Sequence, residues 1–108
     1  MAYTIWQCDY EIRKLNNALN QISYIRSYLS NYVSNVDNEV NRLASSYTVN
    51  GDATNTVTRL KNLRGNANET SNYLKNTIVP AINNAIYKLR KIREELEREE
   101  AEAAAKWN

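Results

Sequence analysis

Apolar side chains recur along the first part of the chain at alternating steps of three and four residues. Between positions 5 and 47 one heptad register accounts for nearly all of them. Its first seam position holds Ile5, Ile12, Leu19, Arg26, Val33, Val40 and Tyr47, and its second holds Cys8, Leu15, Ile22, Leu29, Val36 and Leu43. This spacing, sustained over about six heptads, is typical of a long helix packed lengthwise against another helix. Arg26 interrupts the series, and we expect the neighbouring Ile25 to cover the gap.

The pattern predicts a first helix over about residues 3–47, with Thr4 as a possible N-cap. A turn is expected over about 48–52, where Gly51 suits the left-handed position that closes a helix. Either Asp52 or Thr54 is expected as the next N-cap. An Asn-Gly pair can also mark a β-hairpin, but the flanking residues have helical period rather than alternation. The residues that define the turn are Val49, Asn50 and Gly51.

The second helix, predicted over about 53–106, has a less regular pattern. Its expected inward positions are Leu60, Leu63, Ala67, Thr70, Leu74, Ile78, Ile82, Ala85, Leu89, Ile92 and Leu96. The two steps of four from Leu74 to Ile78 to Ile82 form a stutter, which locally unwinds a coiled coil. Pro80 lies within it and removes a backbone hydrogen bond, so we expect one helix that is kinked near Pro80.

The C-terminal residues 97–108 are expected to overhang the hairpin, because the second helix is longer than the first. They combine high helix propensity with opposite charges four residues apart, and carry no large apolar side chain except Trp107. Two interpretations remain open. The segment is either a solvated, fraying helix end or a recognition tail anchored by Trp107.

Six large aromatic side chains fall outside the seam of the first helix. They form two series, Tyr3-Trp6-Tyr10 and Tyr24-Tyr28-Tyr32, at steps of three or four residues. Such steps place side chains on one strip of a helix surface. Tyr and Trp suit a surface that is wet when free and buried when bound, because each ring carries a polar atom. The strips are therefore candidate partner-binding sites.

The opposite arrangement is also possible, with the rings packed on the second helix and the heptad seam facing a partner. Both arrangements need more helices than one chain supplies. The expected fold is thus an all-α, long antiparallel two-helix hairpin, forming a single domain over residues 1–108 and assembling into a four-helix or larger bundle. The bundle would be either a homodimer or a heteromer.

The composition argues against several classes of function. The chain of 108 residues has two Gly and one Pro, which leaves few places to turn. Its net charge of +2 with mixed signs does not favour nucleic-acid binding. Without His, and with Cys8 expected as a buried structural thiol, we predict no catalytic residue, no metal site and no cofactor. No apolar run is long enough to span a membrane, and no signal for general secretion is present.

The size, the hairpin, the Val49-Asn50-Gly51 turn and the missing signal resemble the small type VII secretion proteins of the Trp-X-Gly family. The resemblance is closest to the small helical partners of LXG toxins in Gram-positive bacteria. It departs from the family pattern at Val49, which stands where the family has Trp. The C-terminal export motif is also missing, because Tyr87 is followed four residues later by Lys91 and Tyr73 by Thr77.

The resemblance implies a non-catalytic targeting factor or chaperone. It would bind the helical N-terminal region of a toxin, or a second small helical protein, and direct the toxin to a type VII secretion system. Such a protein would be cytoplasmic in the producing cell, and it would either stay there or be exported with its partner. The alternative is a homodimeric structural coiled-coil spacer or adaptor that is unrelated to secretion.

Overall fold

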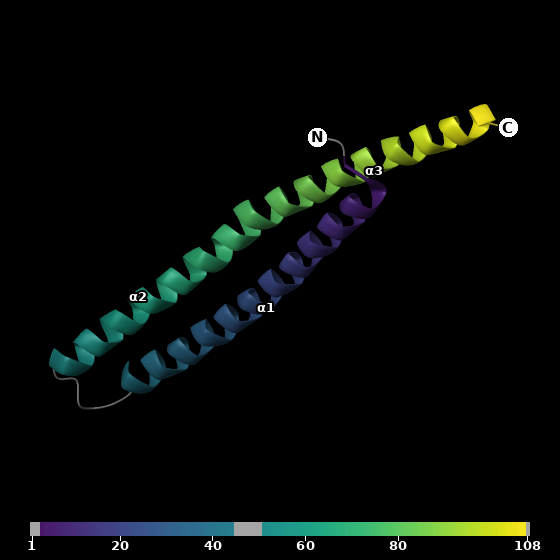
Figure 1. The fold of residues 1–108 in the computed structure, drawn as a ribbon. Coiled ribbons are helices and arrows are strands. Elements are labelled where there is room, and N and C mark those ends of the chain that lie inside the picture. Colours follow the sequence, from purple (N-terminus) through teal and green to yellow (C-terminus); the bar gives the residue numbers. More distant parts are fainter. Residues whose placement is uncertain (1–2, 45–50, 108) are drawn as a thin grey trace. The chain divides into compact units, whose positions relative to one another are not determined.

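The computed structural model describes residues 3–44 and 51–107, with the side chains of 51–53 left out. Every described residue after Thr4 is helical, and no strand occurs among them. The order along the chain is α1 (Ile5–Ala44), α2 (Gly51–Tyr73), the π-helix η1 (Leu74–Ile78) and α3 (Val79–Trp107) (Figure 1). The all-α prediction is confirmed, because the chain forms two long helical segments, the second of which continues from α2 through η1 into α3.

Thr4 caps the first helix, as the sequence predicts. The backbone N–H of Gln7 donates a hydrogen bond of 3.1 Å to Thr4 Oγ1, and the Thr4 N–H donates one of 2.9 Å to Gln7 Oε1. This reciprocal pair is a capping box, which satisfies two backbone donors at the helix start. It fixes Ile5 as the first helical residue.

The heptad seam of α1 is the buried side of the helix. Cys8, Ile22, Val36 and Val40 are buried, and the remaining described seam positions are half-buried. The predicted role of Ile25 is wrong, because Ile25 is 47% exposed whereas Arg26 is half-buried. The chain therefore keeps a cationic side chain in its seam.

The helices form two compact units. The terminal unit comprises Met1–Gln21 with Ile78–Asn108, and the central unit comprises Ile22–Thr77. In the terminal unit the first turns of α1 lie beside α3 (Figure 1). Cys8 and Ile86 are buried there, and Arg93 Nε lies 2.6 Å from Asp9 Oδ1.

In the central unit the rest of α1 and α2 run antiparallel. Arg64 Nη1 lies 2.6 Å from Asp37 Oδ1, and Arg26 Nε donates a hydrogen bond of 3.3 Å to Ser71 Oγ. The earlier residue of α1, Arg26, contacts the later residue of α2, Ser71, and the later Asp37 contacts the earlier Arg64. The two helices therefore run in opposite directions. The buried apolar residues of this unit are Ile22, Val36, Val40 and Ala67.

The buried face of α2 differs from the one expected from its apolar residues. Leu63 is 47% exposed and Thr70 is exposed, whereas Arg64 and Ser71 are half-buried. The polar residues take the inward positions because each finds a partner on α1. The seam of α2 thus lies one residue later than predicted at two of its positions.

The π-helix η1 occupies the stutter. Its wider turn inserts one extra residue, so the inward series passes from Leu74 through Ile78 to Ile82, all half-buried, while Ala81 is exposed. The carbonyl of Asn76, four residues before Pro80, is the group that a proline ring meets in a regular α-helix. The π-helix includes Asn76, so the irregularity lies where the proline ring would otherwise meet this carbonyl.

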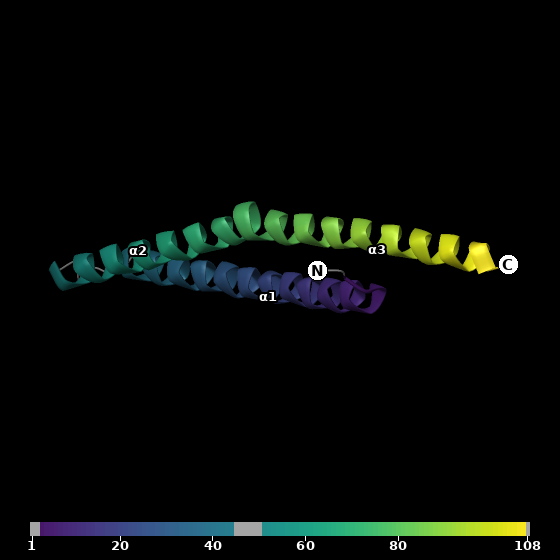
Figure 2. The ribbon, with the colours of Figure 1, turned by 45° about the horizontal axis from the view of Figure 1, so that its top comes forward.

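The other observed helix boundaries differ from the predicted ones by a few residues. Gly51 is the first residue of α2 rather than part of the turn, so the second helix begins before the expected position 53. Val49, Asn50 and the expected seam residue Tyr47 lie outside the described residues. At the other end α3 continues to Trp107, and its C-terminal part extends past the start of α1 in both views of the terminal unit (Figure 2).

Candidate protein-binding surface

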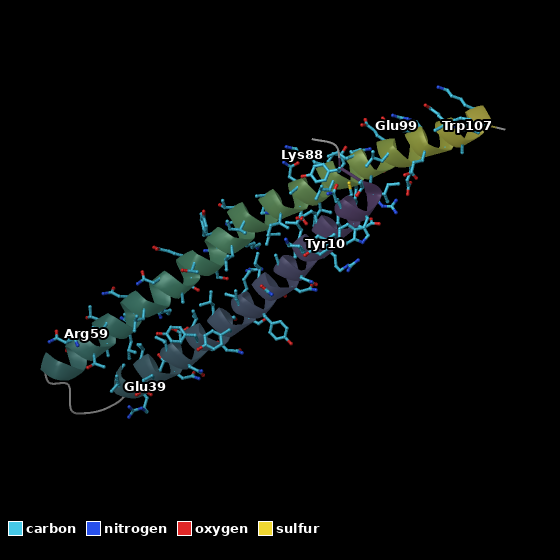
Figure 3. The ribbon with its side chains drawn as sticks, viewed as in Figure 1. Tyr10, Glu39, Arg59, Lys88, Glu99 and Trp107 are labelled. Carbon is cyan, nitrogen blue, oxygen red and sulfur yellow. The ribbon has the colours of Figure 1, made fainter. Side chains whose placement is uncertain are left out.

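The first aromatic strip consists of Tyr3, Trp6 and Tyr10 and belongs to the terminal unit. All three rings are exposed, Trp6 most strongly at 70%. Trp6 and Tyr10 are stacked, with ring centroids 5.4 Å apart and an angle of 10° between the planes. Lys14 Nζ lies 5.2 Å from the centre of the Tyr10 ring, which Figure 3 shows on α1. The strip is a pre-ordered column of two rings and a cation.

The second aromatic strip consists of Tyr24, Tyr28 and Tyr32 and belongs to the central unit. Tyr24 is 82% exposed and Tyr28 is 71% exposed, while Tyr32 is half-buried. Hydroxyl and amide side chains separate the rings. One shallow hollow of about 210 Å³ is lined by Tyr28, Asn31, Tyr32 and Asn35, and another of about 230 Å³ by Ser23, Tyr24 and Ser27.

The spacing of the residues around the first hollow is informative. Positions 28, 31, 32 and 35 follow the steps i, i+3, i+4 and i+7. Four residues at these steps enclose the hole into which one side chain of a facing helix inserts in knobs-into-holes packing. The second hollow is lined by three members of the equivalent set eight residues earlier, at positions 20, 23, 24 and 27. This face of α1 thus has hollows whose lining residues follow the spacing found where helices pack.

The second strip also lacks charge. Between Lys14 and Asp37 the chain has one charged residue, Arg26, and its guanidinium is turned into the seam towards Ser71. Exposed helix faces are ordinarily charged or small and polar. A neutral face rich in Tyr, Ser and Asn has the composition of adaptable protein-binding surfaces, where Tyr supplies rigid area and the polar residues supply hydrogen bonds.

Interhelical ion pairs lie beside the seam of α1 in both units. Asp9 and Asp37 occupy the same heptad position beside the seam, and each contacts an arginine of the returning helices. The hydrogen bond to Asp9, and a second to Glu97, raise the pKa of Arg93 above its usual value. The pairs lie beside the buried seam in each unit, whereas five of the six aromatic side chains of the strips are exposed.

Every described candidate residue of the strips can now be placed. Five of the six rings are exposed and Tyr32 is half-buried. The two strips belong to different units, so each is a surface of its own. Trp107, the candidate anchor of the tail, is 90% exposed near the end of α3 (Figure 3).

Two exposed tyrosines were missed by the sequence reasoning. Tyr73 and Tyr87 are 57% and 59% exposed on the second helical segment, and Lys91 Nζ lies 5.5 Å from the centre of the Tyr87 ring. They stand singly, without the repeated steps of three or four that single out the strips.

Other kinds of site find little support in the described part of the chain. No group of three or more His, Cys, Asp or Glu side chains is placed there to hold a metal ion. Cys8 is fully buried, as predicted for a structural thiol. Among the described helices, none combines the length and apolar character required to cross a membrane.

Comparisons of the chain with protein-family models, with curated proteins and with solved structures find no match. The resemblance to the Trp-X-Gly family therefore remains an expectation based on the size, the turn and the helical pattern.

Proposed function

We propose that the chain is a non-catalytic helical binding module that captures a helix of another protein on the outer face of α1. The observation that carries this proposal is the strip of Tyr24, Tyr28 and Tyr32, which is exposed, uncharged and hollowed at the spacing of a helix-packing hole. The stacked pair of Trp6 and Tyr10 supplies a second anchor. Buried Tyr and Trp rings contribute a large share of the binding energy at protein interfaces.

Covering the exposed rings with a partner is more favourable in free energy than leaving them in water. Each large aromatic side chain gains about 1.5–3 kcal/mol when it leaves water, and its polar atom still finds a hydrogen bond at a wet interface. The rings cost little conformational entropy on binding because each has two side-chain torsions. The chain then joins its partner in a four-helix or larger bundle, with a bend of the second helix at the π-turn and Pro80.

The resemblance to the small partners of LXG toxins supplies a specific candidate. The proposed partner is the helical N-terminal region of such a toxin, and the proposed role is to target it to a type VII secretion system, with possible export of the complex. Helix-to-helix recognition without catalysis is the activity that the strips support. The alternative is a homodimeric spacer, which is favoured by the neutrality of the second strip, since two copies of an uncharged face do not repel one another.

Co-expression with the helical N-terminal region of an LXG toxin tests the proposal. We expect the two proteins to co-purify, and Tyr24→Ala with Tyr28→Ala to reduce recovery of the partner at least about tenfold, because two interface rings together contribute more than about 1.4 kcal/mol. The matched control is Tyr73→Ala with Tyr87→Ala, which removes two similarly exposed rings from the other helical segment. The control should bind normally.

The circular-dichroism signal of both variants separates binding from folding. Unchanged helicity with lost capture supports a partner surface on α1. If the Tyr24/Tyr28 variant loses helicity, the rings belong to the core and the proposal is wrong. A stable homodimer that does not bind the toxin region would favour the spacer instead.

A further inference from the structure

The outer face of α1 in the central unit carries a row of large side chains beside a row of smaller ones. Three tyrosines form the first row, namely Tyr24, Tyr28 and Tyr32. Smaller polar side chains form the neighbouring row, which consists of Ser23, Ser27, Asn31 and Asn35. Residues four apart form the ridges of a helix surface, and the grooves between such ridges receive a neighbouring helix. Both hollows of this face lie where the two rows meet, because each is lined by residues of both rows.

We propose that a second copy of this chain binds the second aromatic strip, with the two α1 helices crossing in the same chain direction. A two-fold axis that runs along the groove between the rows exchanges the places of the two rows. The tyrosine row of each copy then lies over the Ser and Asn row of the other, so large side chains meet small ones. Helices whose four-residue rows align in this way cross at about −50°. The contact is therefore confined to the turns that carry the strip.

The charge pattern of α1 fits a second copy as the occupant. In a two-fold contact each residue near the axis lies beside its own counterpart, so a charged residue there repels itself. The strip avoids this repulsion, because Arg26 is the one charged residue between Lys14 and Asp37. The Arg26 guanidinium donates its hydrogen bond into the seam, to Ser71. The two outer faces can thus meet without bringing like charges together, and the tyrosine hydroxyls find Ser and Asn oxygens opposite them.

The exposed area of the strip is too small for a permanent dimer. The three rings offer roughly 400 Å² per copy, since Tyr24 and Tyr28 are 82% and 71% exposed and Tyr32 is half-buried. A standard stable interface buries about 800 Å² of each partner. We therefore expect reversible self-association, with a Kd of roughly 10–100 μM.

A reversible dimer covers the tyrosines while they have no other partner. The consequence for capture rests on the proposed function: a partner helix that binds the same strip more tightly displaces the second copy, and the resulting complex holds one copy of this chain. The self-association itself is a property of the isolated chain. It can fail while capture succeeds, or hold while capture fails, so the two proposals are tested separately.

Sedimentation equilibrium of the isolated chain, with an exchange of charges at Ser27, tests the second copy. Ser27 lies in the row of smaller residues beside Tyr28, where it faces its counterpart across the axis. We expect Ser27→Glu and Ser27→Lys each to associate at least about tenfold more weakly than the wild type, because like charges then meet. An equimolar mixture of the two variants should regain an affinity within about threefold of the wild type, which also shows that both variants are folded.

The matched control places the same charges on α2, by Asn72→Glu and Asn72→Lys, at an exposed position of the same unit. These variants should associate like the wild type. The exchange at Asn31 should repeat the result at Ser27, because parallel chains place each residue of the row beside its own counterpart. A wild type that stays monomeric at about ten times the expected Kd, charge variants of Ser27 that associate normally, or mixtures that fail to recover at either position would overturn the proposal. A partner complex that keeps two copies joined through the strip would contradict displacement.

Discussion

Arg26 shows how one residue departs from an otherwise regular pattern. It occupies a seam position of α1, and the sequence suggested that Ile25 would take its place. The structure keeps Arg26 inward because Ser71 accepts a hydrogen bond from its guanidinium, and Ile25 stays exposed. A half-buried arginine held by one long hydrogen bond contributes little stability, since its desolvation offsets the bond.

Replacing this polar pair by apolar side chains should therefore stabilise the protein. We expect Arg26→Leu with Ser71→Ala to raise the free energy of unfolding by about 1 kcal/mol, as leucine completes the seam without leaving an unpaired polar group. Urea unfolding of the double variant and of both single variants measures the effect. A double variant less stable than the wild type would show that the hydrogen bond is worth more than the apolar contact.

The sequence predicted the buried face of α1 more completely than the buried face of α2. The seam of α1 was predictable at nearly every position, because its apolar residues outnumber the polar ones on that face. In α2 the apolar residues are sparse, and the choice between Leu63 and Arg64 depends on Asp37, which lies in another element. Periodicity cannot detect a partner across the seam, so the polar inward residues Arg64 and Ser71 were missed.

The π-turn allows a direct test of why it exists. If η1 serves to move the Asn76 carbonyl away from the Pro80 ring, removing Asn76 should force a regular α-turn into that clash. We expect this deletion to cost about 3 kcal/mol with Pro80 present and much less in a Pro80→Ala background. Urea unfolding measures both.

The control for this deletion is removal of Asn62 from α2. It should destabilise the protein in both backgrounds, since it rotates the seam residues that follow. If removal of Asn76 costs the same with and without Pro80, then the π-turn has another cause.

At the scale of the whole molecule, each unit has one seam and one interhelical Asp–Arg pair. The aromatic strips of α1 lie outside the seam. A small chain gains limited stability from a single seam. The proposed capture of another helix on the outer face of α1 would explain why large rings remain exposed.

The most direct measurement is thermal unfolding of two double variants of α1 in the isolated chain. Val36→Ala with Val40→Ala removes buried seam methyl groups, and we expect it to lower the midpoint by roughly 10 °C or more. Tyr24→Ala with Tyr28→Ala removes larger side chains from the outer face and should change the midpoint by less than about 2 °C. A fall in the tyrosine variant as large as in the valine variant would show that these rings are part of the core.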